Sequence, residues 1–173
     1  MSAFTEKALP GSVKKRMTFS LDHYEHLIAC GAFTGEYVKG VELLWGEIVE
    51  TAPIGPPHRE DVDYLARWSL KVVDDALIRV SIQQPIRLPG SESEPEPDIS
   101  WVREKSCAKR HPNPDEVLLV IEVAGSSLEI DRGPKLAAYA KAGIPEYWIV
   151  SCPRRWSRSA ARRRGRTTRI VGS

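Results

Sequence analysis

The sequence has few of the features that mark a specialised class of protein. It contains three cysteines, Cys30, Cys107 and Cys152, an odd number without CxxC spacing, so we expect free thiols. No apolar run approaches the length of a membrane span, and the N-terminal stretch lacks the apolar core of a signal peptide. We therefore expect a cytoplasmic protein without membrane association. His and Cys residues with zinc-ligand spacing are also missing, which argues against a zinc hydrolase or a cytidine-deaminase-like enzyme.

Basic residues are concentrated at one end of the chain. Of the 25 Lys and Arg residues, eight are arginines within residues 153–173, a segment without acids. The other 17 basic residues (25 − 8) stand against 23 acids, so the rest of the chain has a net charge of −6 (17 − 23). The Arg-rich segment has neither helical nor strand periodicity and few apolar residues, which predicts a disordered tail. We expect it to add salt-sensitive, sequence-independent affinity for DNA.

The rest of the chain predicts one α/β domain. The whole chain has 173 residues, of which 42% are hydrophobic and 28% charged, which is typical of a globular protein with a sizeable core, and it has no internal repeats. Hydropathy periodicity and turn residues predict, after a flexible leader over residues 1–16, a helix in 18–31, a hairpin in 41–53, a helix from His58, strands in 77–88, from Asp98 and in 116–123, a helix in 131–143 and a strand in 144–151. This order favours a mixed sheet with helices on its faces.

Two acids stand in unusual places in these predicted strands. In the stretch EPEPDIS, residues 94–100, Asp98 directly precedes an apolar strand, where it either ends a Pro-rich loop or acts as a ligand. Glu122 interrupts the apolar run that begins at Val117, and a buried acid is costly unless a metal ion or another charge compensates it. Consecutive strands are often neighbours, so the two carboxylates could converge, as suits Mg²⁺. We expect the preceding loop acids, Glu92, Glu94 and Glu96, to be solvated.

Other candidate residues have two interpretations each. Glu42 is either a solvated acid of the hairpin, as Glu47 could be, or part of a site. His58 either caps or faces solvent at a helix start, or contacts a metal ion or phosphate. Asp131 and Lys135 are four residues apart, so a simple ion pair on one helix face would explain them. Tyr139, four residues further on, is typical of a core residue.

Several motifs taken together resemble one known family. From about Phe19 to Trp148 the chain is similar to the Uma2-type endonucleases, in the motifs VELLWGEIVE, APIGPPH, EPD, VIEVAGSS, DRGPK and YAKAGIPEYWIV. The resemblance implies a restriction-endonuclease-like fold with an N-terminal hairpin and a degenerate PD-(D/E)xK site. It implies that Asp98 and Glu122 bind Mg²⁺ or Mn²⁺, that Glu42 is a third acidic position, and that Lys135 is the lysine of the site. Ala124 stands where the wider nuclease signature has its lysine.

Two functions follow from these observations. The first is a metal-dependent endonuclease that hydrolyses DNA phosphodiester bonds, with Asp98, Glu122 and Lys135 as catalytic residues and His58 and Asp131 as accessory ones. The second is a catalytically inactive binding or assembly module, which Ala124 favours. Family analogy also implies a homodimer that addresses both DNA strands.

The boundaries of the domain follow from the same comparison of motifs. We expect an endonuclease-like domain over residues 17–152 and the Arg-rich tail over 153–173, because the resemblance ends at Ser151. The tail is either a DNA-binding extension or the product of a shifted reading frame that replaced the final strands of the family.

Overall fold

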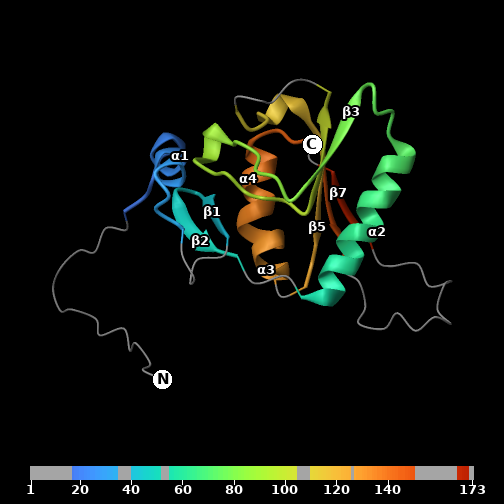
Figure 1. Cartoon of the computed structure of the whole chain (residues 1–173), viewed down its shortest axis with the longest axis horizontal. Helices are drawn as coiled ribbons and strands as arrows, with labels where there is room; N and C mark the ends of the chain where they lie inside the picture. The colour runs from blue at the N-terminus through green and yellow to red at the C-terminus, as the bar shows by residue number, and fades with distance from the viewer. Residues whose placement is uncertain are drawn as a thin grey trace.

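A mixed five-stranded sheet lies at the centre of the computed structural model (Figure 1), which describes residues 17–34, 40–51, 55–104, 110–125, 127–150 and, as backbone, 167–171. The helices are α1 (Leu21–Ala29), α2 (Pro56–Val72), α3 (Leu128–Ile130) and α4 (Leu136–Lys141), with the 3₁₀ turns η1 (Pro89–Ser91) and η2 (Pro114–Glu116) and the π turn η3 (Asp131–Lys135). The strands are β1 (Val41–Leu44), β2 (Glu47–Glu50), β3 (Ile78–Ile82), β4 (Ile99–Arg103), β5 (Val117–Val123), β6 (Glu146–Val150) and β7 (Thr167–Val171). The predicted α/β class and the predicted order of elements up to β6 are confirmed.

The strands of the large sheet are arranged in sequence order, β3-β4-β5-β6-β7. Among the described strands only β5 and β6 are parallel, and the connection between them contains α3, η3 and α4, as a parallel crossover requires. In the antiparallel β4–β5 pair, Ile99 lies opposite Ile121. One step further along this register, Asp98 and Glu122 are opposite each other at the end of the two strands.

The strands β1 and β2 form a separate antiparallel hairpin beside α1. The hairpin turn consists of Trp45 and Gly46, both with positive φ (55° and 77°), the combination that a tight two-residue turn needs. A Cβ at Gly46 would lie 2.9 Å from the Cβ of Thr18, so a larger residue would displace the chain that enters α1. Ser20 caps α1, since its side chain accepts a hydrogen bond from the backbone N–H of His23. The predicted hairpin and first helix are both confirmed.

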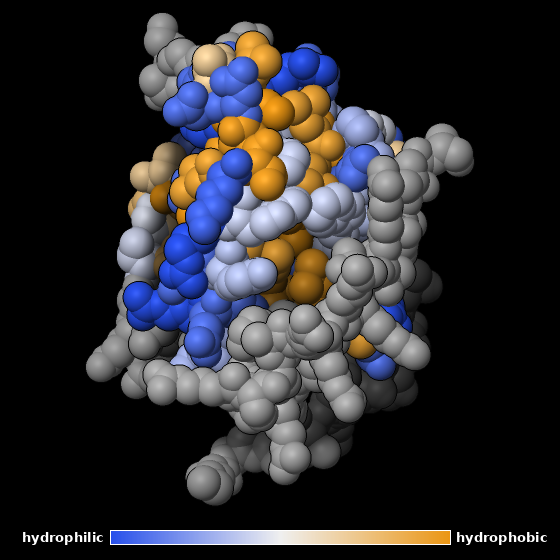
Figure 2. Space-filling model, turned by 90° about the vertical axis from the view of Figure 1, so that its right-hand side faces the viewer, coloured by the Kyte–Doolittle hydropathy of each residue, from blue (hydrophilic) through white to orange (hydrophobic). Residues whose placement is uncertain are grey.

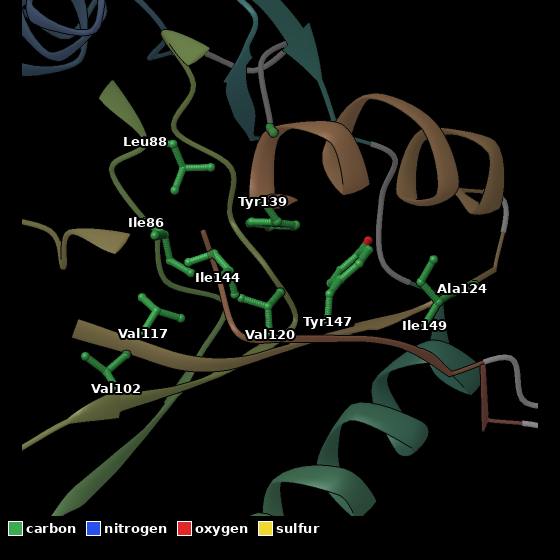
Figure 3. Packing of buried hydrophobic residues seen from close by; sticks show 11 residues of the cluster. Ile86, Leu88, Val102, Val117, Val120, Ala124, Tyr139, Ile144, Tyr147 and Ile149 are labelled. Carbon is green, nitrogen blue, oxygen red and sulfur yellow. The ribbon is translucent and has the colours of Figure 1, made fainter. Parts of the chain in front are cut away.

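Apolar side chains point alternately to the two faces of the large sheet and form a hydrophobic core on each face. On one face, α4 packs on a cluster that includes Val120, Tyr139 and Tyr147, shown in Figure 3. On the other face, α2 packs through Val62 and Ala66 on a second cluster. Because side chains alternate between the faces, Glu122 shares the α4 face with Val120. Its carboxylate is therefore directed towards the helical crossover.

The helix α2 covers the second face only in part. Trp68 on α2 stacks on Trp101, with ring centroids 5.7 Å apart. Large apolar side chains on and after α2 are exposed, among them Tyr64, Leu70 and Leu77. Figure 2 views this side of the molecule and shows apolar patches among hydrophilic residues. Within the described residues, no helix is long and apolar enough to cross a membrane.

The structure corrects three expectations. Glu94 is buried rather than solvated, because its backbone N–H bonds to the carbonyl of Leu43 and draws the loop against the hairpin. Glu92 and Glu96 are exposed, as expected. The helix predicted from residue 131 begins at Leu128, so Pro134 lies inside it, where the π turn accommodates the missing N–H.

The third correction concerns the Arg-rich tail. Residues 167–171 form β7, so the prediction of a tail without strand structure is wrong there. The strand pairs antiparallel with β6, and the edge of β6 is therefore covered. The predicted leader, Cys107, Cys152 and the arginines between residues 151 and 166 lie outside the described residues. Cys30 is a free, exposed thiol, as predicted.

Candidate functional site

The two acids that the sequence singled out meet at one end of the sheet. Asp98 precedes β4, and Glu122 is the penultimate residue of β5. The backbone N–H of Asp98 is 3.4 Å from Glu122 Oε2, and the N–H of Val123 donates to Asp98 Oδ2 over 2.8 Å. Both carboxylates are thus held by backbone groups of the paired strands. The predicted convergence of Asp98 and Glu122 is confirmed.

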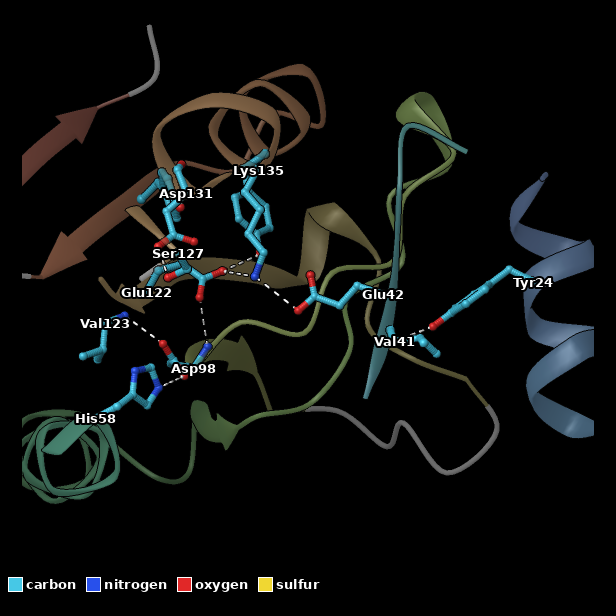
Figure 4. Close-up of polar contacts among 12 residues, drawn as sticks. Tyr24, Val41, Glu42, His58, Asp98, Glu122, Val123, Ser127, Asp131 and Lys135 are labelled. Atoms are coloured by element: carbon cyan, nitrogen blue, oxygen red, sulfur yellow. Dashed lines mark hydrogen bonds and ion pairs between the residues drawn. The ribbon is translucent and has the colours of Figure 1, made fainter. Parts of the chain in front are cut away.

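The ammonium group of Lys135 lies between two acids that come from distant parts of the chain (Figure 4). Its Nζ donates to Glu122 Oε1 over 3.0 Å and to Glu42 Oε1 over 3.2 Å. All three side chains are buried. Glu42 is therefore not a solvated hairpin acid, since β1 delivers it into the interior. The hydroxyl of Tyr139 donates to Glu122 Oε1 as well, over 3.2 Å, so this core residue also orients an acid.

His58 contacts the other acid. Its Nε2 is 2.8 Å from Asp98 Oδ1, within hydrogen-bond distance. The hydrogen bond to Asp98 raises the pKa of His58. Pro56 and Pro57 begin α2, and their missing N–H groups explain how this helix starts without a side-chain cap. His58, the next residue, is thereby fixed at the edge of the site.

The π turn places Asp131 and Lys135 in the same cavity without pairing them. Asp131 is almost fully buried and accepts a hydrogen bond from Ser127 Oγ over 2.7 Å, whereas Lys135 binds Glu42 and Glu122. A π turn widens the helix, and such turns are frequent at functional sites. The simple ion pair between Asp131 and Lys135 is therefore not what explains their spacing.

Acidic groups outnumber basic groups in the site. Burial raises the pKa of Glu122 to about 8, and it also raises the pKa of Glu42 and of Asp131, although Lys135 opposes each shift. Burial alone would lower the pKa of Lys135, but the surrounding acids raise it by more, so Lys135 stays charged. One ammonium group faces several buried carboxyls, so the site favours an additional cation.

A cavity of about 300 Å³ opens onto these groups. Its walls come from the hairpin, the start of α2, the end of β3 and the α3–η3 segment. Its polar lining residues are Glu42, Glu50, Thr51, His58, Gln83, Glu96, Asp98, Glu122, Ser127, Asp131 and Lys135. Six of these are acids, and the lining has one lysine and one histidine. The cavity is thus an acidic pocket with room for a small ligand or a hydrated ion.

The donor set of this pocket fits one kind of metal ion. Among the described residues, no three His, Cys, Asp or Glu side chains are grouped so that they could hold a metal ion. One oxygen of Glu42 and one oxygen of Glu122 already accept hydrogen bonds from Lys135. Mg²⁺ is commonly held by one or two carboxylates together with water and substrate phosphate. Asp98 and Glu122 fit that pattern, and a closed site such as structural zinc does not fit.

Two interactions of the site, one by Tyr139 and one by Ser127, were missing from the sequence prediction. Tyr139 was expected to be a core residue, and only the four-residue step from Lys135 indicated that it would face Glu122. Ser127, which bonds to Asp131, follows the interrupted strand in the motif VIEVAGSS but has no periodicity of its own.

The mixed sheet, the hairpin and the buried acid–lysine cluster define a restriction-endonuclease-like α/β protein. A crystal structure described as that of "a putative nuclease belonging to DUF820 from Anabaena variabilis ATCC 29413" has a similar fold, with a TM-score of 0.57 and 15% identity over 77% of this chain and 74% of that chain. The chain belongs to the Uma2 family, described as "Putative restriction endonuclease", whose model matches residues 36–169. No curated protein matches the chain.

This match corrects the predicted end of the family resemblance. It continues past Ser151 to residue 169, and so includes most of β7. An abrupt loss of the family's final strand was the reason for considering a shifted reading frame. With β7 paired to β6, that reason no longer applies to residues 167–169.

Proposed function

We propose that this protein is a metal-dependent endonuclease that hydrolyses phosphodiester bonds in DNA. The observation that carries the proposal is the buried arrangement of Asp98, Glu122 and Lys135 at the wall of an acidic pocket. An acid pair beside a lysine can hold a divalent ion and stabilise charge on a phosphate, and membership of the Uma2 family agrees with this chemistry. Lys135 takes the role of the signature lysine that Ala124 lacks, since its Nζ reaches Glu122 from the π turn.

Asp98 and Glu122 are the residues that would hold the ion, which we expect to be Mg²⁺ or Mn²⁺. When bound, such an ion lowers the pKa of a coordinated water and neutralises charge on the phosphate. His58 holds Asp98 through Oδ1, and the Val123 N–H holds it through Oδ2. Each acid is therefore oriented before any ligand arrives, which reduces the reorganisation that binding requires.

Lys135 and Tyr139 orient Glu122. Both donate to Oε1, whereas among the described residues Oε2 has only the weak contact with the Asp98 N–H and is the oxygen more available to a ligand. The Lys135 ammonium also supplies a positive charge and hydrogen-bond donors for a phosphate oxygen or an attacking hydroxide. In this proposal Glu42 keeps Lys135 in place, and Asp131 adds negative charge to the pocket.

A double-stranded substrate has two strands to cut. We propose a two-fold dimer that would place one such site on each strand, as closed symmetric pairs allow. Sedimentation analysis of the intact chain tests this part separately.

The test of the proposed function is a comparison of conservative variants. Asp98→Asn and Glu122→Gln should abolish Mg²⁺-dependent DNA cleavage while leaving the far-ultraviolet circular dichroism unchanged, because each substitution keeps the side-chain shape and removes one charge. Lys135→Ala should lower turnover more than metal affinity. Glu129→Gln, an exposed acid on α3, is the matched control and should cleave like wild type. Unchanged cleavage by Glu122→Gln would remove Glu122 from the mechanism.

The second candidate function is a binding module that has lost catalysis, and Ala124 favours it. Calorimetric titration with Mg²⁺ or Mn²⁺ separates the two. A bound ion that disappears in Glu122→Gln supports the nuclease, and the absence of any binding supports the module.

A further inference from the structure

Gln83 has a backbone conformation that glutamine rarely adopts. It follows Ile82, the last residue of β3, with φ of 49°. Two other described residues apart from glycine have positive φ, and both lie in tight turns: Trp45 in the hairpin and Glu92 at the end of η1. Glycine would occupy the conformation of Gln83 with less strain. Strained residues of this kind are concentrated at functional sites, so an observed outlier is a reason to look for a role.

The strained residue is in direct contact with the site. The N–H of Gln83 donates to the backbone carbonyl of Asp98 over 3.1 Å, which extends the β3–β4 pairing by one residue and turns the chain at the acid. Gln83 also lines the acidic cavity. The bend therefore fixes Gln83 beside Asp98 rather than on the outer surface of the sheet.

The carboxamide of Gln83 is available for a ligand. Gln83 is half-buried, and its side chain makes no hydrogen bond to another described residue, whereas the amide of the next residue, Gln84, bonds to the Gln83 carbonyl over 3.0 Å. Most of the polar side chains that line the cavity are acids or are already paired. A neutral group that both donates and accepts can contact DNA there without adding to the repulsion of the phosphates.

We propose that Gln83 is a substrate-contacting residue that hydrogen-bonds a nucleotide of the bound DNA strand next to the phosphate at Asp98. This inference rests on the proposed function and deepens it. Glutamine contacts phosphate oxygens, which fixes the register of a protein on DNA, and it also pairs with the adenine edge, which discriminates between bases. A residue that holds the nucleotide raises affinity and lowers KM, with kcat little changed.

The experiment compares three variants with wild type in the full-length chain. Gln83→Gly relieves the backbone strain and removes the amide, Gln83→Asn tolerates the left-handed conformation but shortens the reach, and Gln84→Ala is the exposed neighbouring control. Binding of a fluorescent DNA duplex is measured by anisotropy in EDTA and again with Ca²⁺. Cleavage kinetics with Mg²⁺ and the melting temperature are measured on the same samples.

We expect Gln83→Gly to melt no lower than wild type, and we expect both Gln83 variants to bind DNA at least fivefold more weakly, with a matching rise in KM. Gln84→Ala should behave like wild type. A loss of affinity that is equal for all DNA sequences identifies a contact with phosphate. A loss of affinity confined to some DNA sequences identifies a contact with a base. Wild-type affinity and KM in both Gln83 variants would overturn the inference about Gln83 without affecting the proposed function. A wild-type chain that neither binds nor cleaves DNA would overturn the proposed function together with it.

Discussion

Lys135 compensates the charge of the buried acids Glu42 and Glu122, and its removal should destabilise the protein in a pH-dependent way. We consider Lys135→Met, which keeps the length and the apolar stem of the side chain and removes the charge. In wild type the Nζ bonds to Glu42 and Glu122, and all three groups are buried. In the variant, two acids lie in the interior without their shared partner.

The loss in the free energy of unfolding depends on whether the two acids can be neutralised by protons instead of by Lys135. At pH 8 the loss in the free energy of unfolding should be about 3–5 kcal/mol, the usual cost of removing one partner of a buried ion pair. At pH 5 each carboxyl can take up a proton at a cost of about 1 kcal/mol, because this pH is close to the ordinary glutamate pKa. The loss at pH 5 should therefore be only about 1–2 kcal/mol.

Proton linkage determines whether the stability of the protein rises or falls with pH. Burial raises the pKa of Glu122 from 4.5 to about 8 in the folded protein, so the native state binds more protons than the unfolded state in that window. The stability of wild type consequently falls as the pH rises from about 4.5 to about 8. Without Lys135 the pKa of Glu42 rises further too, so the stability of the variant falls more steeply.

Urea denaturation at pH 5 and pH 8 measures the difference. Tryptophan fluorescence can follow it, since Trp68, Trp101 and Trp148 pack together on the sheet. Lys141→Met is the matched control: Lys141 is an exposed lysine on α4 whose interaction with the Trp45 ring contributes about 0.5–1 kcal/mol at either pH. A loss for Lys135→Met that is the same at pH 5 and pH 8 would refute the reasoning, because it would show that Lys135 acts through packing alone.

Two further predictions concern other parts of the chain. The pKa of Glu94 is raised to about 7 by burial and by Glu25. In urea denaturation, Glu94→Gln should therefore match wild type at pH 5 and be about 2 kcal/mol more stable than wild type at pH 8. A variant as stable as wild type at both pH values would contradict this prediction. Replacing the arginines of residues 151–166 by glutamine should flatten the slope of log affinity for DNA against log salt, by about 0.9 for each phosphate that the arginines no longer neutralise. An unaltered slope in a salt series would exclude a binding role for these arginines.

The parts of the fold that depend on local pattern could be predicted from the sequence. Periodicity and turn residues located every strand up to β6 and the helices α1, α2 and α4, because each buries one face or ends at Gly or Pro, but they did not indicate the turns η1, η2 and η3. Asp98 and Glu122 could be found for the same reason, since an acid at the head of one strand and another inside an apolar strand both conflict with their surroundings.

Interactions between distant segments could not be predicted. The burial of Glu42 depends on how the hairpin docks against the helix that carries Lys135, 93 residues later in the chain. The burial of Glu94 depends on a bridge to Leu43, and its raised pKa depends on that burial and on Glu25 from α1, whereas its local sequence is that of a Pro-rich loop. The stretch TTRIV of β7 does contain β-branched residues, but a short strand becomes recognisable only when its partner is known.

The pairing of β7 with β6 has a consequence for the basic segment between them. Val150 lies opposite Thr167 and also beside Val123, so the segment leaves and re-enters the sheet at the end where Glu122 lies. Val150 and Thr167, the described residues on either side of this segment, are therefore fixed at the end of the sheet that carries the acidic pocket, and residues 151–166 contain seven arginines and no acid. A truncation at residue 153 would remove that charge and would also expose the edge of β6 to other chains. Substitution of the arginines is therefore the cleaner experiment, since solubility and DNA affinity would otherwise change together.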